Sequence, residues 1–221
     1  MKPAEIKPFY RRNLPHIQPI GAAFFVTFRL QGSIPQGKLF ELKKAFDQTI
    51  VNVFKENTPF LNERIYDERK RFFGKYDALL DGSKTGHHYL KQPEIAELVV
   101  NELLRFNGDL YDLIAYCIMS NHVHILIDTS IQIPESYEIT VFESLDLEPL
   151  SNIMKKIKGP TAVYANRLLN RSGKFWQRES YDHYVRNQKE FENIIRYILE
   201  NPVKAGLVSV WEEYPFSFLK Q

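Results

Sequence analysis

The sequence predicts a mixed fold of α-helices and at least three β-strands. Two apolar runs, residues 111–119 and 122–128, are separated by a polar two-residue link that is typical of a β-hairpin. Residues 21–30 are rich in Phe, Val and Thr and predict a further strand. Residues 93–106 start with a proline and carry an apolar stripe, which predicts an amphipathic helix. With 221 residues, 44% of them hydrophobic, the chain can build a globular core.

Further helices are predicted on both sides of these elements. Apolar residues recur at helical spacing over residues 37–55, and a second helix is expected at about residues 62–80. Helical patterning resumes at Ser151, and we expect it to break at Gly159-Pro160 and to restart with Pro160 as the first helical residue.

The last predicted helix has signals at both ends. Asn187 is a candidate N-cap residue, and Glu190 occupies the capping-box position three residues later. Asn201-Pro202 predicts the end of this helix, because the residue before a proline disfavours the helical conformation.

Charge is distributed unevenly, although the net charge is only +2. Residues 129–154 contain five acidic residues and no Lys or Arg, whereas residues 155–178 contain seven basic residues and no Asp or Glu. Such a basic block indicates a surface for a polyanion. The alternative is a solvated helix face.

The single cysteine, Cys117, excludes an intrachain disulfide and a site built from several thiolates, and its apolar surroundings predict a small core residue. Residues 1–12 are polar, and no apolar run approaches the length of a membrane span. We therefore expect a cytoplasmic protein.

His122 and His124 stand one residue apart at the start of a predicted strand. Successive strand residues point to opposite faces, so both imidazoles share one face, roughly 6–7 Å apart along the strand. This spacing lets both reach one metal ion. Two solvated or hydrogen-bonded imidazoles are the alternative.

Tyr197 and Asn201 are four residues apart on the last predicted helix, so they lie on the same side of it. A phenol beside a metal site is a candidate nucleophile, although its ordinary pKa of about 10 requires a cation or base nearby. Tyr181 and Tyr184 are rival nucleophiles. Taken alone, Tyr197 could be a boundary tyrosine and Asn201 a helix-terminal residue.

Together, the segments YCIMSNHVHILID, KFWQRESYDHYVRN and IIRYILENPVKAGLV resemble the REP-associated tyrosine transposases, relatives of single-strand insertion-sequence transposases within the HUH endonucleases. The resemblance covers roughly residues 21–217. It implies an α+β domain with a ferredoxin-like antiparallel sheet and helices packed on one face of it. The chain would form one transposase domain, residues 1–221, with a core at about 21–34 and 93–217, a helical insertion at about 35–92, and an acidic loop at 130–148.

The resemblance also implies a site. His122, His124 and Asn201 would bind Mg²⁺ or Mn²⁺, and Tyr197 would attack DNA to form a 5′-phosphotyrosine bond. The substrate would be single-stranded, hairpin-bearing DNA that is nicked and rejoined. The protein would act as a monomer or a homodimer, and it would be associated with the nucleoid when it is bound to DNA.

A DNA-binding surface would then use the basic block and its neighbourhood, because cations neutralise phosphates and aromatic rings, such as those of Tyr164 and Phe175, stack on unpaired bases. Its predicted members are Lys155, Lys156, Lys158, Arg167, Arg171, Lys174, Trp176, Arg178 and Arg186. Trp176 could instead be a core anchor. Two other functions stay open: a catalytically silent DNA- or RNA-binding regulator, and a metal-dependent phosphodiesterase that uses activated water.

Overall fold

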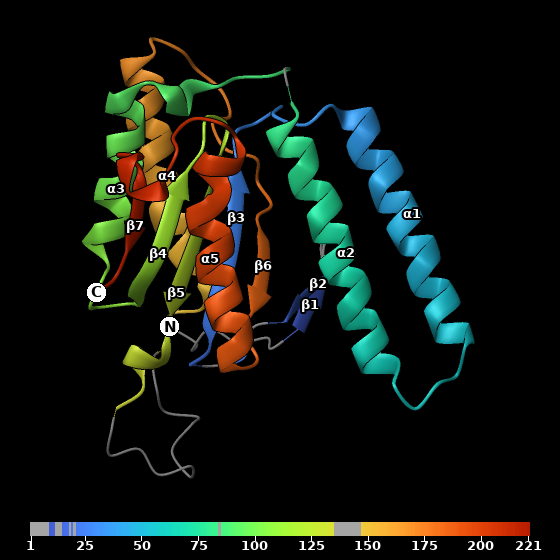
Figure 1. Cartoon of the computed structure of the whole chain (residues 1–221). Helices are drawn as coiled ribbons and strands as arrows, with labels where there is room; N and C mark the ends of the chain where they lie inside the picture. The colour runs from blue at the N-terminus through green and yellow to red at the C-terminus, as the bar shows by residue number, and fades with distance from the viewer. Residues whose placement is uncertain (1–8, 12–14, 18, 20, 84, 135–146) are drawn as a thin grey trace, which may run out of the picture. The chain divides into compact units, whose positions relative to one another are not determined.

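The computed structural model of the chain describes residues 9–11, 15–17, 19, 21–83, 85–134 and 147–221 (Figure 1). Most of the predicted acidic loop therefore lies outside the described residues. The chain divides into two compact units, residues 1–30 with 89–221 and residues 31–88. Its elements, in chain order, are β1 (Phe9–Arg11), β2 (Pro15–Ile17), β3 (Ala23–Arg29), α1 (Gln36–Lys55), α2 (Leu61–Asp81), η1 (Tyr89–Lys91), α3 (Pro93–Arg105), β4 (Asp112–Ile118), β5 (His122–Asp128), η2 (Ser130–Gln132), α4 (Leu150–Leu168), β6 (Tyr181–Tyr184), α5 (Gln188–Lys204), η4 (Trp211–Glu213) and β7 (Ser217–Leu219).

The first unit contains the main sheet. Among the described residues this sheet has five strands in the order β6-β3-β5-β4-β7, and every neighbouring pair is antiparallel. Apart from α1 and α2, which belong to the second unit, the strands and α-helices from β3 onward follow in the order β3, α3, β4, β5, α4 and β6. Their four strands take the spatial order fourth, first, third, second. This order is ferredoxin-like, so the predicted α+β fold with an antiparallel sheet is confirmed.

The two faces of the sheet bury different side chains. Phe24, Val26 and Phe28 of β3 belong to one hydrophobic core with residues of α3 and α4. Phe25 and Thr27 point to the opposite face, because strand residues alternate. Helix α5 packs mainly over β4 and β5 on that opposite face (Figure 1). The expectation that the helices cover one face is therefore wrong, since α5 covers the other.

Strand register places the paired histidines beneath α5. The predicted hairpin is confirmed, and it is closed by a hydrogen bond of 2.9 Å from Met119 N to the His122 carbonyl. In the pairing of β3 with β5, Thr27 lies opposite His124 and Arg29 lies opposite His122. All four side chains therefore share the α5 face of the sheet.

Helix α4 is continuous, so the predicted break at residues 159–160 is wrong. Pro160 lies inside α4. An interior proline lacks an N–H donor and costs about 3 kcal/mol. On both sides of it Ile153, Ile157 and Ala165 are buried against the sheet. This continuous buried stripe outweighs the local cost.

Helix α5 begins as predicted and ends later than predicted. Asn187 is its N-cap, and Asn187 Oδ1 accepts a hydrogen bond of 2.9 Å from Glu190 N. The helix continues through Pro202 to Lys204. Asn201 and Pro202 are both buried, so packing of the last turn holds the residue before the proline in helical conformation.

The second unit contains the helices α1 and α2, which pack against each other. The rings of Phe46 and Phe72 lie 4.7 Å apart, the rings of Phe72 and Tyr76 lie 6.2 Å apart, and Val53 is buried. Across the described parts of both units, no helix is sufficiently long and apolar to cross a membrane. The cytoplasmic location stays a prediction.

The hydroxyl of Thr161 gives a test of how α4 is held on the core. Thr161 Oγ1 accepts a hydrogen bond of 2.8 Å from the buried indole Nε1 of Trp176. Replacing Thr161→Val removes the acceptor and leaves a buried N–H unpaired, so we expect a loss of about 1–3 kcal/mol in the free energy of unfolding. Urea denaturation measures it. Thr161→Ser, which keeps the hydroxyl, should lose less, and equal losses would contradict this assignment.

Candidate functional site

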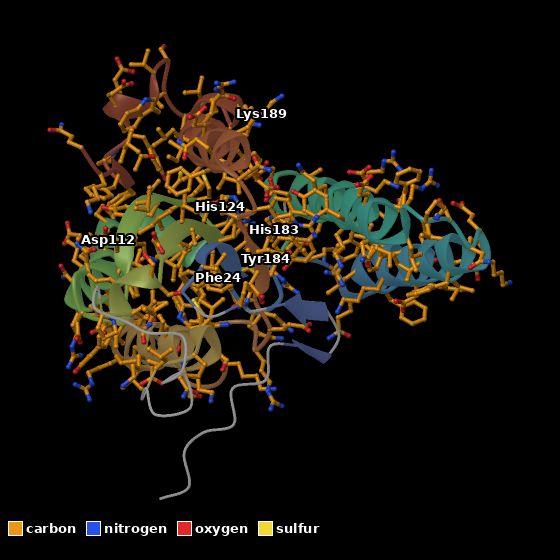
Figure 2. All side chains as sticks on the ribbon, turned by 90° about the horizontal axis from the view of Figure 1, so that it is seen from below. Phe24, Asp112, His124, His183, Tyr184 and Lys189 are labelled. Atoms are coloured by element: carbon orange, nitrogen blue, oxygen red, sulfur yellow. The ribbon has the colours of Figure 1, made fainter. Side chains whose placement is uncertain are left out.

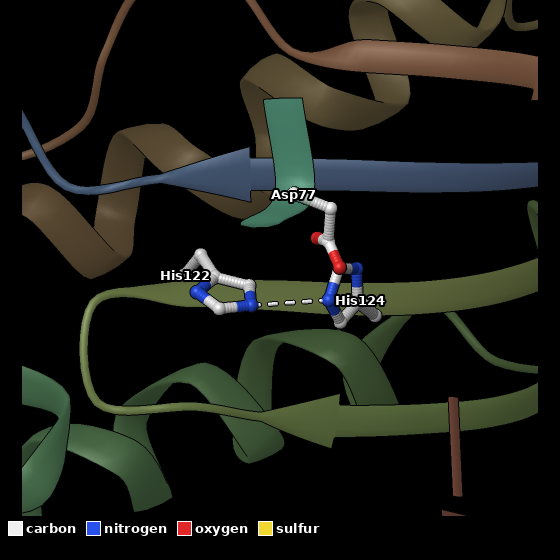
Figure 3. Close-up of side chains that lie close together, drawn as sticks. All are labelled: Asp77, His122 and His124. Atoms are coloured by element: carbon white, nitrogen blue, oxygen red, sulfur yellow. Dashed lines mark hydrogen bonds between the residues drawn. The ribbon is translucent and has the colours of Figure 1, made fainter. Parts of the chain in front are cut away.

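The two histidines of β5 face each other. His122 Nε2 and His124 Nε2 are 3.0 Å apart, and both side chains are buried (Figure 3). His122 Nδ1 lies 2.6 Å from Asn121 Oδ1. Because the amide oxygen accepts only, Nδ1 of His122 carries the hydrogen and its Nε2 presents a lone pair. An outer partner of this kind fixes the tautomer and orientation of a metal-binding imidazole.

The tautomer of His124 depends on Thr27. His124 Nδ1 lies 2.8 Å from Thr27 Oγ1, and a hydroxyl can either accept or donate. When the hydroxyl accepts, both Nε2 lone pairs point to one place and can share a cation. When it donates, His124 Nε2–H instead donates to His122. Burial lowers the pKa of His124 to about 3, so the ring stays neutral at ordinary pH.

The spacing of the two nitrogens fits a divalent cation. Two imidazole nitrogens about 2.1 Å from one metal, on neighbouring corners of an octahedron, are roughly 3.0 Å apart. The distance of 3.0 Å between the two Nε2 atoms matches this geometry. The donor set therefore could bind a metal ion.

Tyr197 lies beside the histidine pair. Its ring centroid is 5.4 Å from that of His124 and 5.8 Å from that of Phe25. Phe25 in turn stacks on His124 at 5.7 Å. The structure thus brings His122, His124 and Tyr197 together, and one phenylalanine contacts both the imidazole and the phenol ring.

Asn201 follows Tyr197 by one helical turn and is buried. Asn201 Nδ2 donates a hydrogen bond of 2.8 Å to the carbonyl of Tyr197, which directs Oδ1 away from the helix backbone. Lys204 Nζ lies 5.4 Å from the Tyr197 ring centroid and 3.0 Å from a carboxylate oxygen of Glu200. The same helix therefore presents a phenol, an amide oxygen and a cation within two turns.

The start of α5 is anchored to the edge strand β6. His183 Nε2 lies 3.1 Å from Glu190 Oε1, and Glu190 Oε2 accepts a hydrogen bond of 3.0 Å from Arg186 N. Burial raises the pKa of Glu190. This carboxylate binds both the strand and the turn before the helix. It therefore fixes the N-terminal end of α5, two helical turns before Tyr197.

The two rival tyrosines lie on opposite faces of β6. Tyr184 is opposite Phe24 and packs against the core on the α3 and α4 side, whereas His183 is opposite Phe25 (Figure 2). Tyr181 is opposite Thr27, on the face of the histidines, and its ring lies 6.4 Å from that of Phe25. Among these two rivals, only Tyr181 shares a face with the histidine pair.

Lys158 has neighbours that favour a structural role. Its ammonium donates hydrogen bonds to Gln177 O (2.8 Å), Arg178 O (3.2 Å) and Ser180 Oγ (3.0 Å). Burial, with the nearby Arg29 cation, lowers its pKa to about 8. Three acceptors account for its three N–H donors, so it ties α4 to the segment that leads into β6.

Other predicted DNA-binding residues lie on the outer surface of α4. Lys155, Lys156 and Arg167 are exposed, and α4 covers the sheet face opposite α5. Lys156 Nζ is 3.6 Å from a carboxylate oxygen of Glu148. The guanidinium of Arg167 lies 6.0 Å from the ring of Tyr164, which is 47% exposed and so can contact a ligand.

The segment that follows α4 carries the rest of the predicted basic surface. The guanidinium of Arg171 lies 5.2 Å from the ring of Tyr89, and that of Arg186 lies 5.3 Å from the ring of Tyr184. The two remaining residues of the predicted DNA-binding surface, Lys174 and Arg178, are exposed.

Trp176 is buried, with its ring 4.9 Å from Phe28 and its indole N–H bonded to Thr161. Phe175 is buried beside it. This packing favours the core-anchor interpretation of Trp176 over base stacking.

Several residues of the site were missed by the sequence analysis, namely Phe25, Thr27, Arg29 and Asn121. Alternation along β3 places the first three on one face, a pattern that is visible in the sequence. The sequence does not show that this face meets His122 and His124, because that depends on the register with β5.

Similarity to one curated protein supports the resemblance. No protein-family model matches the chain. Over 110 residues, the chain is 31% identical to a putative REP-associated tyrosine transposase of Haemophilus influenzae, and the match covers 48% of this chain and 58% of that protein. The chain thus matches little more than half the length of this curated relative. A solved structure described as a REP-associated tyrosine transposase bound to a REP hairpin covers 94% of this chain and 80% of its own, with a TM-score of 0.43 and 18% identity.

Thr27 provides a test of the paired imidazoles. Thr27→Val keeps the shape of the side chain but removes the hydroxyl that orients His124, so we expect Mn²⁺ affinity to fall about 10- to 100-fold. Isothermal titration calorimetry with Mn²⁺ measures this loss. Thr27→Ser keeps the hydroxyl and should retain most of the affinity. Unchanged binding in Thr27→Val would show that His124 needs no such partner.

Proposed function

We propose that this chain is a metal-dependent tyrosine transposase that binds, nicks and rejoins single-stranded, hairpin-bearing DNA. The observation that carries the proposal is the placement of Tyr197, whose ring lies 5.4 Å from His124, itself paired with His122 through Nε2 atoms 3.0 Å apart. Similarity at 31% identity to a putative REP-associated tyrosine transposase supports the same activity.

The histidine pair would hold the divalent cation, with Asn201 Oδ1 as a further ligand. A bound cation supplies charge that polarises the scissile phosphate and orients it. Imidazole suits transition metals better than Mg²⁺, so of the two expected ions Mn²⁺ should bind more tightly. Neutral imidazole and amide ligands leave the positive charge of the site intact, which favours the phosphate.

Tyr197 would be the nucleophile. Its phenol oxygen attacks phosphorus and forms an O–P bond, while the bond from phosphorus to the 3′-oxygen breaks. The phenol proton leaves to solvent, and the departing 3′-oxygen is protonated to a hydroxyl. The DNA 5′-phosphate then remains on Tyr197. Because this phosphodiester keeps the energy of the original bond, a second 3′-hydroxyl can reverse the step and join strands without ATP.

The packing around Tyr197 supports a positioned nucleophile. Phe25 meets its ring edge-on at 5.8 Å, with an interplanar angle of 89°, and Asn201 bonds its carbonyl. Glu190 and His183 hold the start of the same helix on the sheet. A nucleophile held in this way loses little freedom when it attacks, which is a main source of rate enhancement.

The DNA would also contact exposed cations outside this site. Lys155, Lys156 and Arg167 can neutralise phosphates, and the exposed ring of Tyr164 can stack on an unpaired base.

Covalent capture of DNA tests the nucleophile. We expect the wild-type chain, incubated with labelled hairpin DNA and Mn²⁺, to give a protein–DNA band on denaturing gels. Tyr197→Phe should abolish the band, because it removes only the attacking oxygen. Tyr184→Phe should keep it, since that ring lies on the other face of the sheet.

Each other outcome points to a different nucleophile or to a different activity. Loss of the band in Tyr181→Phe with retention in Tyr197→Phe would reassign the nucleophile to the rival on the same face. Cleavage without any covalent band would indicate a phosphodiesterase that uses water. Tight binding with neither cleavage nor a band would indicate a binding regulator.

The basic surface of α4 is tested by charge reversal. Lys155→Glu with Lys156→Glu should weaken hairpin DNA binding at low salt by about tenfold or more and flatten its salt dependence, because fewer phosphates are neutralised. Fluorescence anisotropy measures both effects. Lys75→Glu, an exposed lysine of α2, is the control and should leave binding unchanged. Equal affinities in all three proteins would remove this part of α4 from the DNA surface.

A further inference from the structure

Helix α5 ends in a fixed geometry. Gly206 has a left-handed conformation, with a φ of +67°. Its N–H donates a hydrogen bond of 2.9 Å to the Val203 carbonyl, and the Leu207 N–H donates one of 2.9 Å to the Pro202 carbonyl. These two hydrogen bonds form a Schellman motif, which defines the end of the helix. The last helical residue, Lys204, therefore has a fixed backbone position.

Lys204 lies on the same side of α5 as Tyr197. Seven residues separate them, which is nearly two full turns of a helix. Side chains of a helix lean toward its N-terminus, so the side chain of Lys204 reaches back toward Tyr197. Its ammonium Nζ lies 5.4 Å from the centroid of the Tyr197 ring. The ring centroid of His124 lies at the same distance, so one phenol ring has a cation and a candidate metal ligand as neighbours.

A cation in the last turn of a helix also has a structural explanation. It interacts favourably with the helix dipole, and Lys204 Nζ is 3.0 Å from a carboxylate oxygen of Glu200. Both side chains are about half exposed, at 56% and 47%, and an ion pair with this exposure contributes little to stability. Neither interaction requires the ammonium to lie over the Tyr197 ring. That position indicates a role in the chemistry of the phenol.

The phosphate that Tyr197 attacks must lie against its phenol oxygen. Tyr197 is half-buried and Lys204 is exposed, so DNA can reach both side chains. A phosphate at this place is within reach of the ammonium, because the lysine side chain is long and flexible. During the attack, negative charge is spread over the non-bridging oxygens of the phosphate, and a cation beside them stabilises the transition state.

We propose that Lys204 binds a non-bridging oxygen of the scissile phosphate and is therefore a catalytic residue. The proposal rests on Tyr197 being the nucleophile, as proposed above. In the free protein Glu200 pairs with the ammonium, and the phosphate takes the place of Glu200 when DNA binds. Lys204 transfers no proton in this step, so the bonds that form and break are those of the Tyr197 attack.

The rate of covalent capture tests this role. With labelled hairpin DNA and Mn²⁺ in single-turnover conditions, Lys204→Met should slow formation of the protein–DNA band about 10- to 100-fold, because one charge that stabilises the transition state is lost. Lys204→Arg keeps a cation and should recover most of the rate. Lys189→Met is the matched control, since it removes an exposed lysine at the start of the same helix (Figure 2). It should leave the rate unchanged.

Glu200→Gln separates this role from a structural one. Loss of the carboxylate leaves Lys204 to the phosphate, so the band should form about two- to fivefold faster at low salt. If the ion pair served only to stabilise the end of α5, Glu200→Gln and Lys204→Met would both slow the reaction, and that result would contradict the proposal. Thermal unfolding followed by circular dichroism should differ little among these variants, because both side chains are half exposed.

DNA binding without metal gives a measurement that does not depend on catalysis. Lys204→Met should lower the slope of log Kd against log salt concentration by about one, because one phosphate contact is lost. With a neutral methylphosphonate at the cleaved position of the hairpin DNA, the wild-type chain and Lys204→Met should have equal slopes, since the charge that Lys204 binds is absent. Fluorescence anisotropy measures both slopes.

The outcomes distinguish the role of Lys204 from that of Tyr197. A wild-type band that forms equally fast in Lys204→Met, or a salt dependence that Lys204→Met leaves unchanged, would overturn the role of Lys204 and keep Tyr197 as the nucleophile. Equal slowing by Lys204→Met and Lys189→Met would also overturn it, because the effect would then belong to the charge of the whole helix. Absence of a band in the wild-type chain would overturn Tyr197 as the nucleophile and the role of Lys204 with it.

Discussion

The pairing of β3 with β5 is the constraint on which the rest of the site depends. It sets Thr27 opposite His124, and the hydrogen bond between them orients one of two imidazoles that face each other. A shift of one residue would turn Thr27 to the other face of the sheet and place Val26 or Phe28, neither of which can bond the imidazole, opposite His124. Large apolar side chains alternate along β3 and pack on the α3 and α4 face, which makes such a shift costly. Packing of the core on one face therefore holds Thr27 opposite His124 on the other face.

Phe25 joins the two halves of the site. Its ring stacks on His124 and meets Tyr197 edge-on, so the strand that carries the histidines and the helix that carries the phenol share one apolar contact. Glu190 and His183 hold the same helix at its start. A polar contact at one end and an aromatic contact near the middle therefore define where Tyr197 lies. Neither contact uses the candidate ligand atoms themselves.

The sequence predicted what depends on local pattern. The shared face of His122 and His124 follows from strand alternation, and the start of α5 follows from the capping pattern at Asn187. The predicted break at Pro160 was wrong because a rule about local backbone was outweighed by burial on both sides of it. The distinction between Tyr181 and Tyr184 required β6, a strand of four residues that is too short to give a periodic signal. Partners such as Thr27 required a register between distant strands, which no local pattern contains.

The separation of these partners along the chain has a consequence for biosynthesis. Thr27 and His124 are 97 residues apart, and Tyr197 follows only after a further helix and strand. Contacts between such distant segments form late, because the loop between them must close first. A ribosome-bound chain that has emerged only as far as β5 holds both histidines and lacks Tyr197. If Tyr197 is the nucleophile, as we propose, such a chain has no partial activity during its own synthesis, and it becomes competent only when α5 has docked on the sheet.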